Sequence, residues 1–251
     1  MKNYVEIIQN EWNQAFLEMS QQRGFQRLLN DDLGIEHYKN ALRQIYLQTR
    51  DNPSLQAAAT LNFKGTQRDL MKKYLGHALS EVGHDQLAIE DLKALGEDVT
   101  QLCTYRPLPG TSALMGFGYY AATGCAPAVY LGYIYHLESM PMKSGGMYIS
   151  KLKALGVPES ALTFIDEHAK FDVAHMKLNE EYIKTFIQND EDLENFLFGM
   201  RTSAALYSKM LEDAFAYADR GISSLGYNVS EERRAISQVA SSSETSDRAA
   251  A

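Results

Sequence analysis

Cysteine, proline and clustered basic residues are scarce in this chain. Two cysteines among 251 residues, Cys103 and Cys125, cannot form a disulfide framework, so we expect a reducing compartment and a cytoplasmic location. The formal net charge is −8 and no stretch gathers Lys and Arg, which argues against a nucleic-acid partner because phosphate binding depends on such clusters. Most of the six prolines lie in residues 107–158, so nothing prevents long helices in the first and last thirds of the chain.

Charged side chains are absent from residues 107–137, and this run is long enough to cross a membrane as a helix. It contains several glycines, Pro127 and five tyrosines, with few Leu, Ile or Val residues. We therefore predict a buried, tightly packed hairpin and no membrane partner. The N-terminal segment has acidic residues where a signal peptide needs an uninterrupted apolar core, so no export signal is expected.

Apolar residues recur with helical spacing along nearly the whole chain, and no convincing strand alternation is present. We predict an all-α fold with one domain over residues 1–226. After Tyr227 the sequence is Ser-rich and charged and has no aromatic residue, so residues 227–251 are predicted to form a disordered tail. The predicted helices span residues 4–19, 35–49, 54–61, 67–95, 112–124, 127–139, 146–155, 158–188 and 191–220.

One predicted helix, 158–188, carries a carboxylate between two imidazoles. His168, Asp172 and His175 stand at i, i+4 and i+7, so all three side chains lie on one face. The two histidines are two turns apart, or about 10 Å along the helix axis. This spacing suits two metal ions better than one.

Further carboxylates and histidines occur in two other predicted helices. Glu81 and His84 stand at i and i+3 in helix 67–95, and Glu138 follows the uncharged run. His77 lies one turn before Glu81 on the same stripe, and we interpret it as a neighbouring polar residue and not as a ligand. A pair of iron ions requires carboxylates as bridging ligands and imidazoles as terminal ligands, and these residues supply both kinds. Manganese is the alternative metal. Zinc usually takes fewer carboxylates, and magnesium does not favour three imidazoles.

The order Glu-x-x-His, lone Glu, His-x-x-x-Asp-x-x-His, spread over about half of the chain, resembles the heme-oxygenase-like diiron oxidases. That superfamily includes fatty-acid decarboxylases and amine N-oxygenases. The resemblance implies a heme-oxygenase-like helical bundle with two iron ions (Fe²⁺/Fe³⁺), O₂ as cosubstrate and no heme. It also implies the ligand sets, which are Glu81, His84 and His168 for one iron and Glu138, Asp172 and His175 for the other, with a glutamate bridging.

The activity implied by this resemblance is oxidation or oxygenation of a small molecule, such as an amino acid, an amine or a fatty acid, through a peroxo-diferric intermediate. An external electron donor and a homodimer are compatible with it. The tyrosines between Met115 and Met147 are candidates for the lining of a substrate pocket, although helical aromatic stripes more often form the core. They are Tyr119, Tyr120, Tyr130, Tyr133 and Tyr135.

Two other functions stay open on the sequence. Cys125 resembles the nucleophile of thiaminase-II-like members of the same fold, which would make the protein a metal-free hydrolase. A buried cysteine is more often a packing residue, and no activating base is identifiable near it in the sequence. The second alternative is a non-catalytic helical binding protein, which would lack a pocket around the six predicted ligands.

Overall fold

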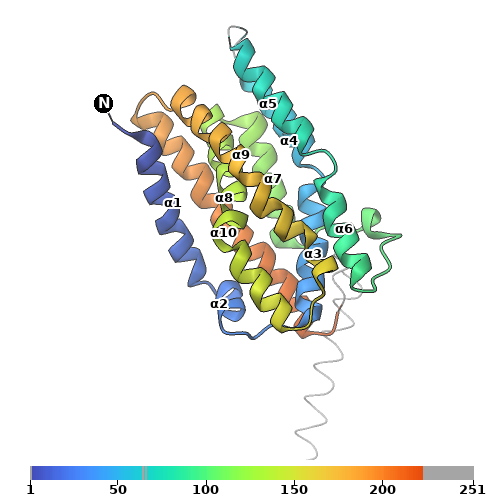
Figure 1. The fold of residues 1–251 in the computed structure, drawn as a ribbon. Helices are drawn as coiled ribbons and strands as arrows, with labels where there is room; N and C mark the ends of the chain where they lie inside the picture. Colours follow the sequence, from blue (N-terminus) through green and yellow to red (C-terminus); the bar gives the residue numbers. More distant parts are fainter. Residues whose placement is uncertain (1, 64, 66, 223–251) are drawn as a thin grey trace, which may run out of the picture.

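The computed structural model describes residues 2–63, 65 and 67–222, without the side chains of residues 170–174. Over these residues the chain is helical apart from turns and loops, which confirms the all-α prediction (Figure 1). The predicted tail, 227–251, lies outside the described residues. The α-helices are α1 (Tyr4–Ser20), α2 (Arg23–Leu29), α3 (Ile35–Thr49), α4 (Asn52–Ala59), α5 (Arg68–Ser80), α6 (His84–Ala94), α7 (Pro109–Gly124), α8 (Pro127–Ala154), α9 (Thr163–Phe186) and α10 (Asp190–Asp219). Three single turns of 3₁₀ helix are η1 (Thr60–Asn62), η2 (Leu102–Thr104) and η3 (Glu159–Ala161).

The centre of the bundle is α8, which packs most extensively against α10 and α9. The backbones of the two helices α8 and α10 come into contact at Gly132 of α8 and Gly199 of α10. A Cβ atom built on Gly132 would lie 2.0 Å from the Phe196 carbonyl oxygen, and one on Gly199 would lie 2.0 Å from that of Val129. Neither position accepts a side chain unless the helices separate. The two glycines therefore set the distance between the central helices.

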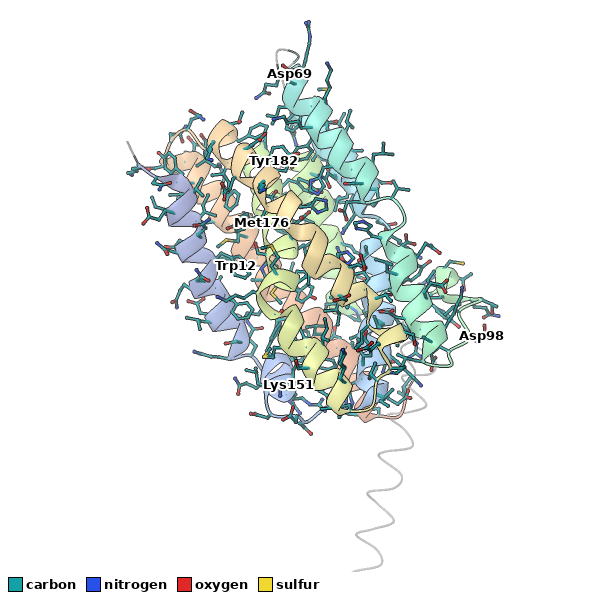
Figure 2. All side chains as sticks on the ribbon, in the orientation of Figure 1. Trp12, Asp69, Asp98, Lys151, Met176 and Tyr182 are labelled. Carbon is teal, nitrogen blue, oxygen red and sulfur yellow. The ribbon has the colours of Figure 1, made fainter. Side chains whose placement is uncertain are left out.

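A smaller apolar cluster joins α3 and α6 to this centre. Leu42 and Leu47 of α3, Leu92 of α6 and Leu152 of α8 are buried together in it. The helix α6 therefore packs against the bundle, whereas α5 contacts mainly α4 and η1. Helix α5 projects beyond one end of the bundle, with Asp69 at its outer tip and Lys151 at the opposite end of the molecule (Figures 1 and 2).

Several helix boundaries differ from the predicted ones. Predicted helix 67–95 is two helices, because Gly83 adopts a φ of 98°, in the left-handed region, between α5 and α6. Predicted helices 127–139 and 146–155 are one helix, α8, which contains Pro141. Helix α9 begins at Thr163, because Pro158 is extended and precedes η3. Helix α2 was not predicted.

The uncharged run 107–137 forms α7 and the first part of α8. A short connection at Cys125 and Ala126 joins the two helices, as expected for a hairpin. In the part of the chain that the structure describes, no helix has the length and apolarity that crossing a membrane would require.

Candidate metal centre

Four side chains from three helices converge in the interior of the bundle. His77 and Glu81 come from α5 and its C-cap, Glu138 from α8 and His175 from α9, and one donor atom of each lies within 4.8 Å of the others. The first three are buried and His175 is half-buried. Two carboxylates and two imidazoles at this separation form a donor set suited to a first-row transition metal. We call these four residues the inner cluster.

Glu138 lies between the two imidazoles of the inner cluster. Its Oε1 is 3.0 Å from Nε2 of His77, and its Oε2 is 2.9 Å from Nδ1 of His175. The centroids of the two imidazole rings are 4.2 Å apart. Burial by itself raises the pKa of Glu138, but His175 and His77 outweigh it and lower that pKa to about 2. The carboxylate is therefore ionised at neutral pH, although it is buried.

The nitrogens of His77 indicate that the inner cluster suits a cation. Its Nδ1 is buried and has no hydrogen-bond partner among the described residues, whereas its Nε2 lies 3.0 Å from Oε1 of Glu138. A buried polar atom without a partner costs about 1–3 kcal/mol, so such atoms usually have a ligand or water partner. Metal coordination by an imidazole nitrogen supplies such a partner.

The second oxygen of Glu81 faces another histidine. Its Oε1 lies 3.8 Å from Nε2 of His77 and 3.6 Å from Nδ1 of His175, whereas Oε2 lies 3.2 Å from Nδ1 of His84. The ring of His84 packs edge-on against that of His168, with 5.1 Å between centroids. One carboxylate thus connects the inner cluster to a pair of imidazoles, His84 and His168, which we call the outer pair.

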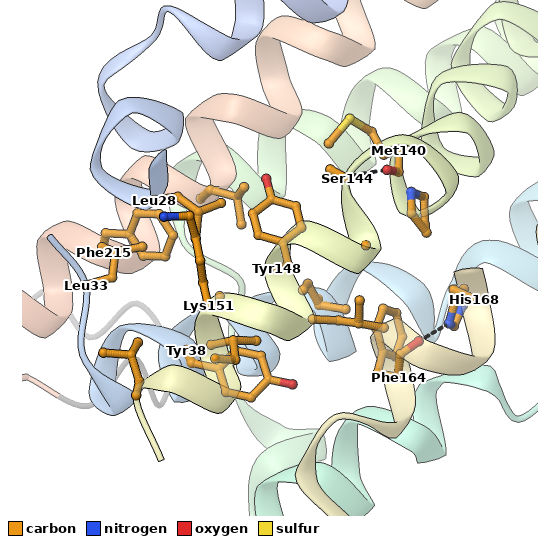
Figure 3. A pocket seen from close by; sticks show the side chains of 18 of the residues that line it. Leu28, Leu33, Tyr38, Met140, Ser144, Tyr148, Lys151, Phe164, His168 and Phe215 are labelled. Atoms are coloured by element: carbon orange, nitrogen blue, oxygen red, sulfur yellow. Dashed lines mark hydrogen bonds between the residues drawn. The ribbon is translucent and has the colours of Figure 1, made fainter. Parts of the chain in front are cut away.

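A backbone contact fixes the tautomer of His168. Its Nδ1 lies 2.7 Å from the carbonyl oxygen of Phe164, one turn earlier in α9 (Figure 3). A carbonyl only accepts, so Nδ1 carries the proton and Nε2 keeps its lone pair. Burial lowers the pKa of His168, so the ring is neutral at neutral pH. Both properties are those of a metal-ligating histidine.

Local structure positions both histidines of the outer pair. Because Gly83 turns the chain between α5 and α6, Glu81 and His84 are not on one helix, as predicted, but on either side of a break. Asp91 of α6 then accepts hydrogen bonds from the backbone N–H groups of Thr163 and Phe164, at 2.9 Å each. It thereby caps the first turn of α9, the helix that carries His168.

Of the six predicted ligands, Glu81, Glu138 and His175 lie in the inner cluster, and His84 and His168 form the outer pair. The side chain of Asp172 lies outside the described residues. His77 was not among the ligands predicted from the sequence, and the structure places it in the inner cluster. The sequence does contain an indication of this position, because His77 stands four residues before Glu81 and both side chains therefore lie on one face of a helix.

A cavity of about 70 Å³ adjoins the cluster, and its lining includes Glu81, Glu138, His168 and His175. A second, more apolar cavity of about 110 Å³ is also lined by His168. None of the five tyrosines predicted to form a pocket lines either of these two cavities. Tyr130, Tyr133 and Tyr135 are buried in the core instead, and Tyr119 and Tyr120 are exposed on α7. The tyrosines that line the apolar cavity are Tyr38, Tyr148 and Tyr207.

Comparisons with known proteins identify the family of this chain. Residues 39–208 match the protein family described as iron-containing redox enzymes. This chain belongs to that family. No curated protein matches the chain in sequence.

Solved structures show the heme-oxygenase-like fold of the chain, which confirms the predicted fold. A domain of unknown function with this fold from Shewanella denitrificans OS217 has 20% identity and a TM-score of 0.80, over 91% of this chain and 99% of the other. A TenA homologue from Pseudomonas syringae pv. tomato has 15% identity and a TM-score of 0.71, over 85% and 93%. A CADD-like protein of unknown function from Nostoc punctiforme has 14% identity and a TM-score of 0.64, over 86% and 96%. At these identities the likeness concerns the fold alone.

The structural similarity to a TenA homologue bears on the alternative function, in which Cys125 would be the nucleophile. This residue is the C-cap of α7, is half-buried and lines neither cavity. Both of these cavities are lined by His168, and the smaller one also by Glu81, Glu138 and His175.

Proposed function

We propose that this protein is a non-heme diiron oxidoreductase that activates O₂ and oxidises or oxygenates a small molecule. The observation that carries the proposal is the position of Glu81, whose two oxygens face different histidines. A carboxylate in this position can bridge two metal ions. Membership of the iron-containing redox enzymes supports iron as the metal.

The residues fall into two ligand sets around Glu81. His77, Glu138 and His175 would hold one iron together with Oε1 of Glu81. His84 and His168 would hold the other together with Oε2. Asp172, one turn before His175, remains a predicted ligand. This assignment adds His77 to the set that the sequence predicts.

Iron bound in this centre would supply the reduction of O₂ and the oxidation of the substrate. The helices α5, α8 and α9 hold the donor side chains of the inner cluster in the interior of the bundle. Glu138 keeps its negative charge inside the bundle because two imidazoles flank it. The Phe164 carbonyl holds the proton of His168 at Nδ1, so Nε2 stays available. The adjoining cavities offer a small molecule access to His168.

Anaerobic loading with Fe(II), followed by addition of O₂, tests the proposal. The loaded protein should consume O₂ rapidly and hold two iron ions per chain. His168→Ala should lower both the iron content and O₂ consumption, whereas His37→Ala, a control at the far end of α3, should change neither. Failure to bind iron, or unchanged O₂ consumption in His168→Ala, would refute the proposal.

A further inference from the structure

The apolar cavity of about 110 Å³ has an inner end at His168 and an outer end at Lys151, as Figure 3 shows. His168 also lines the cavity at the metal centre. At the outer end the lining includes two exposed residues. Leu155 is 38% exposed, and the side chain of Asp31 is 72% exposed. The cavity therefore reaches the molecular surface beside Lys151, away from His168.

The Lys151 side chain joins the two walls of this mouth. One wall is α8, which carries Lys151, and the other is the connection between α2 and α3. The Lys151 ammonium donates a hydrogen bond to the carbonyl oxygen of Leu29, the last residue of α2, at 3.0 Å. It also forms an ion pair with Asp31, in the connection itself. The lysine side chain, which is 21% exposed, thus lies across the mouth of the cavity.

The backbone on the far side of the mouth is held in place. Asp31 has a φ of 56°, and among the described residues it is the only one other than glycine in the left-handed region. Hydrogen bonds hold the chain on both sides of it. The N–H of Asp32 donates to the carbonyl of Arg27 at 2.9 Å, and the N–H of Gly34 donates to Nδ1 of His37 at 2.9 Å. The movable part of the mouth is therefore the lysine side chain.

The contacts that hold the Lys151 side chain are easily broken. An ion pair with a partner as exposed as Asp31 contributes little stability, because water and salt screen it. A lysine side chain also regains rotamer freedom when its ammonium group is released. Its ammonium group therefore exchanges between an anchored position, in which the side chain covers the mouth, and a free one in solvent.

We propose that Lys151 is a gate that controls the passage of small molecules between solvent and the apolar cavity, and through this cavity the approach to His168. The gate is closed while the ammonium group is anchored at Leu29 and Asp31, and it is open when the group is released. Gating of this kind goes beyond the proposed function, because it concerns access and needs no metal.

The rate at which a thiol inside the cavity is alkylated tests the gate. Ser144 lines the cavity and is buried, so Ser144→Cys places a thiol there. The full-length, metal-free protein also carries Cys103→Ser and Cys125→Ser, which remove the native thiols. Acrylonitrile is the probe, because it is a small alkylating agent, and mass spectrometry follows its addition. The probe reaches the thiol only through the open state, so the rate reports how often the gate is open.

Lys151→Ala should raise the labelling rate most, by about fivefold or more, because it removes both anchors and the side chain that covers the mouth. Asp31→Asn should raise it about twofold, since the contact with Leu29 remains and asparagine tolerates the φ found there. Lys151→Arg keeps the charge and should label as slowly as the parent protein. Salt at about 1 M should accelerate labelling of the parent but not of Lys151→Ala.

Two controls separate the gate from general loosening of the fold. Lys153 also forms an ion pair on α8, with Glu159, but lines neither cavity, so Lys153→Ala should not change the labelling rate. Ser203 is buried outside both cavities, and its hydroxyl donates to the carbonyl four residues earlier, as that of Ser144 does. A thiol introduced by Ser203→Cys should label at the same slow rate with and without Lys151→Ala.

The gate is overturned if Lys151→Ala leaves the labelling of Ser144→Cys unchanged, or if Lys153→Ala accelerates it equally. Parallel acceleration of Ser203→Cys by Lys151→Ala would also overturn it, because the whole fold would then be opening. Labelling that depends on Lys151 in a protein that takes up no iron would support the gate and refute the diiron proposal. The two claims can thus fail separately.

Discussion

The inner cluster and the outer pair differ in how many donors they bring together. In the inner cluster, four donor atoms from three helices lie within 4.8 Å, around a carboxylate that two imidazoles keep ionised. In the outer pair, two imidazoles approach each other beside one oxygen of Glu81, and His168 opens onto both cavities. In the proposed diiron centre, the inner cluster would therefore hold its iron more tightly, and the outer pair would be the half that a small molecule can approach. The two metals should therefore differ in affinity.

Glu81→Gln should have the largest effect, because both halves share this carboxylate. The amide keeps the shape of the side chain but loses the charge that faces three histidines. We expect iron content to fall from two ions per chain to fewer than one, measured by elemental analysis after gel filtration. Glu90→Gln on the exposed face of α6 is the control and should retain both ions. Two ions retained in Glu81→Gln would show that it does not bridge.

Single histidine variants separate the halves. His77→Ala should remove the tightly bound ion, since His77 lies in the inner cluster, and His168→Ala should remove the weakly bound one. Titration with Co(II), followed by its absorption spectrum, resolves the two binding steps. If His77→Ala left the tight step intact, His77 would not be a ligand, and the ligand set predicted from the sequence alone would stand.

A variant of Asp91 tests how α6 positions α9, the helix that carries both His168 of the outer pair and His175 of the inner cluster. Asp91→Ala leaves the N–H groups of Thr163 and Phe164 without their acceptor, at the start of α9. The free energy of unfolding should fall by about 2 kcal/mol, as for loss of a buried helix cap. Urea denaturation measures it. Asp98→Ala, at an exposed turn, should cost less than about 1 kcal/mol. Equal losses in both variants would contradict a special role of Asp91.

A pair of glycine variants gives the smallest expected effect and concerns the outer pair. Gly83→Ala should destabilise the protein by about 1–2 kcal/mol, because its φ of 98° strains any other residue. Gly76→Ala, inside α5 where an added Cβ meets nothing within 4 Å, should stabilise it by about 0.5–1 kcal/mol. Thermal unfolding followed by circular dichroism distinguishes the signs. Gly83→Ala should also weaken the second metal-binding step, which depends on His84.

Much of the fold was predictable from the sequence, because helical periodicity and turn glycines are local signals. Helix α3 has the predicted bounds, 35–49, and Gly96, Gly156 and Gly221 have the positive φ expected of helix ends. The break at Gly83 was not predictable in this way, because the apolar pattern continues across it. The continuity of α8 was not predictable either. A proline usually ends a helix, but tertiary packing retains Pro141 inside this one.

The candidate site was predictable in its chemistry and less so in its arrangement. Spacing along a helix identifies residues that share a face, which is how Glu81 and His175 were identified, whereas Glu138 was identified because it follows the uncharged run. It does not say which faces meet, so the contact of His77 with Glu138 could not be found from the sequence. An aromatic stripe on α8 can likewise face the core or a cavity, and Tyr130, Tyr133 and Tyr135 are buried in the core.

Electron paramagnetic resonance of the iron-loaded, air-oxidised protein tests the central claim most directly, because it distinguishes two bridged irons from isolated ones. Two ferric ions that share Glu81 should couple antiferromagnetically, so the protein should contain two irons per chain and give almost no signal. A signal from isolated high-spin ferric ions that accounts for all of the bound iron would contradict the account.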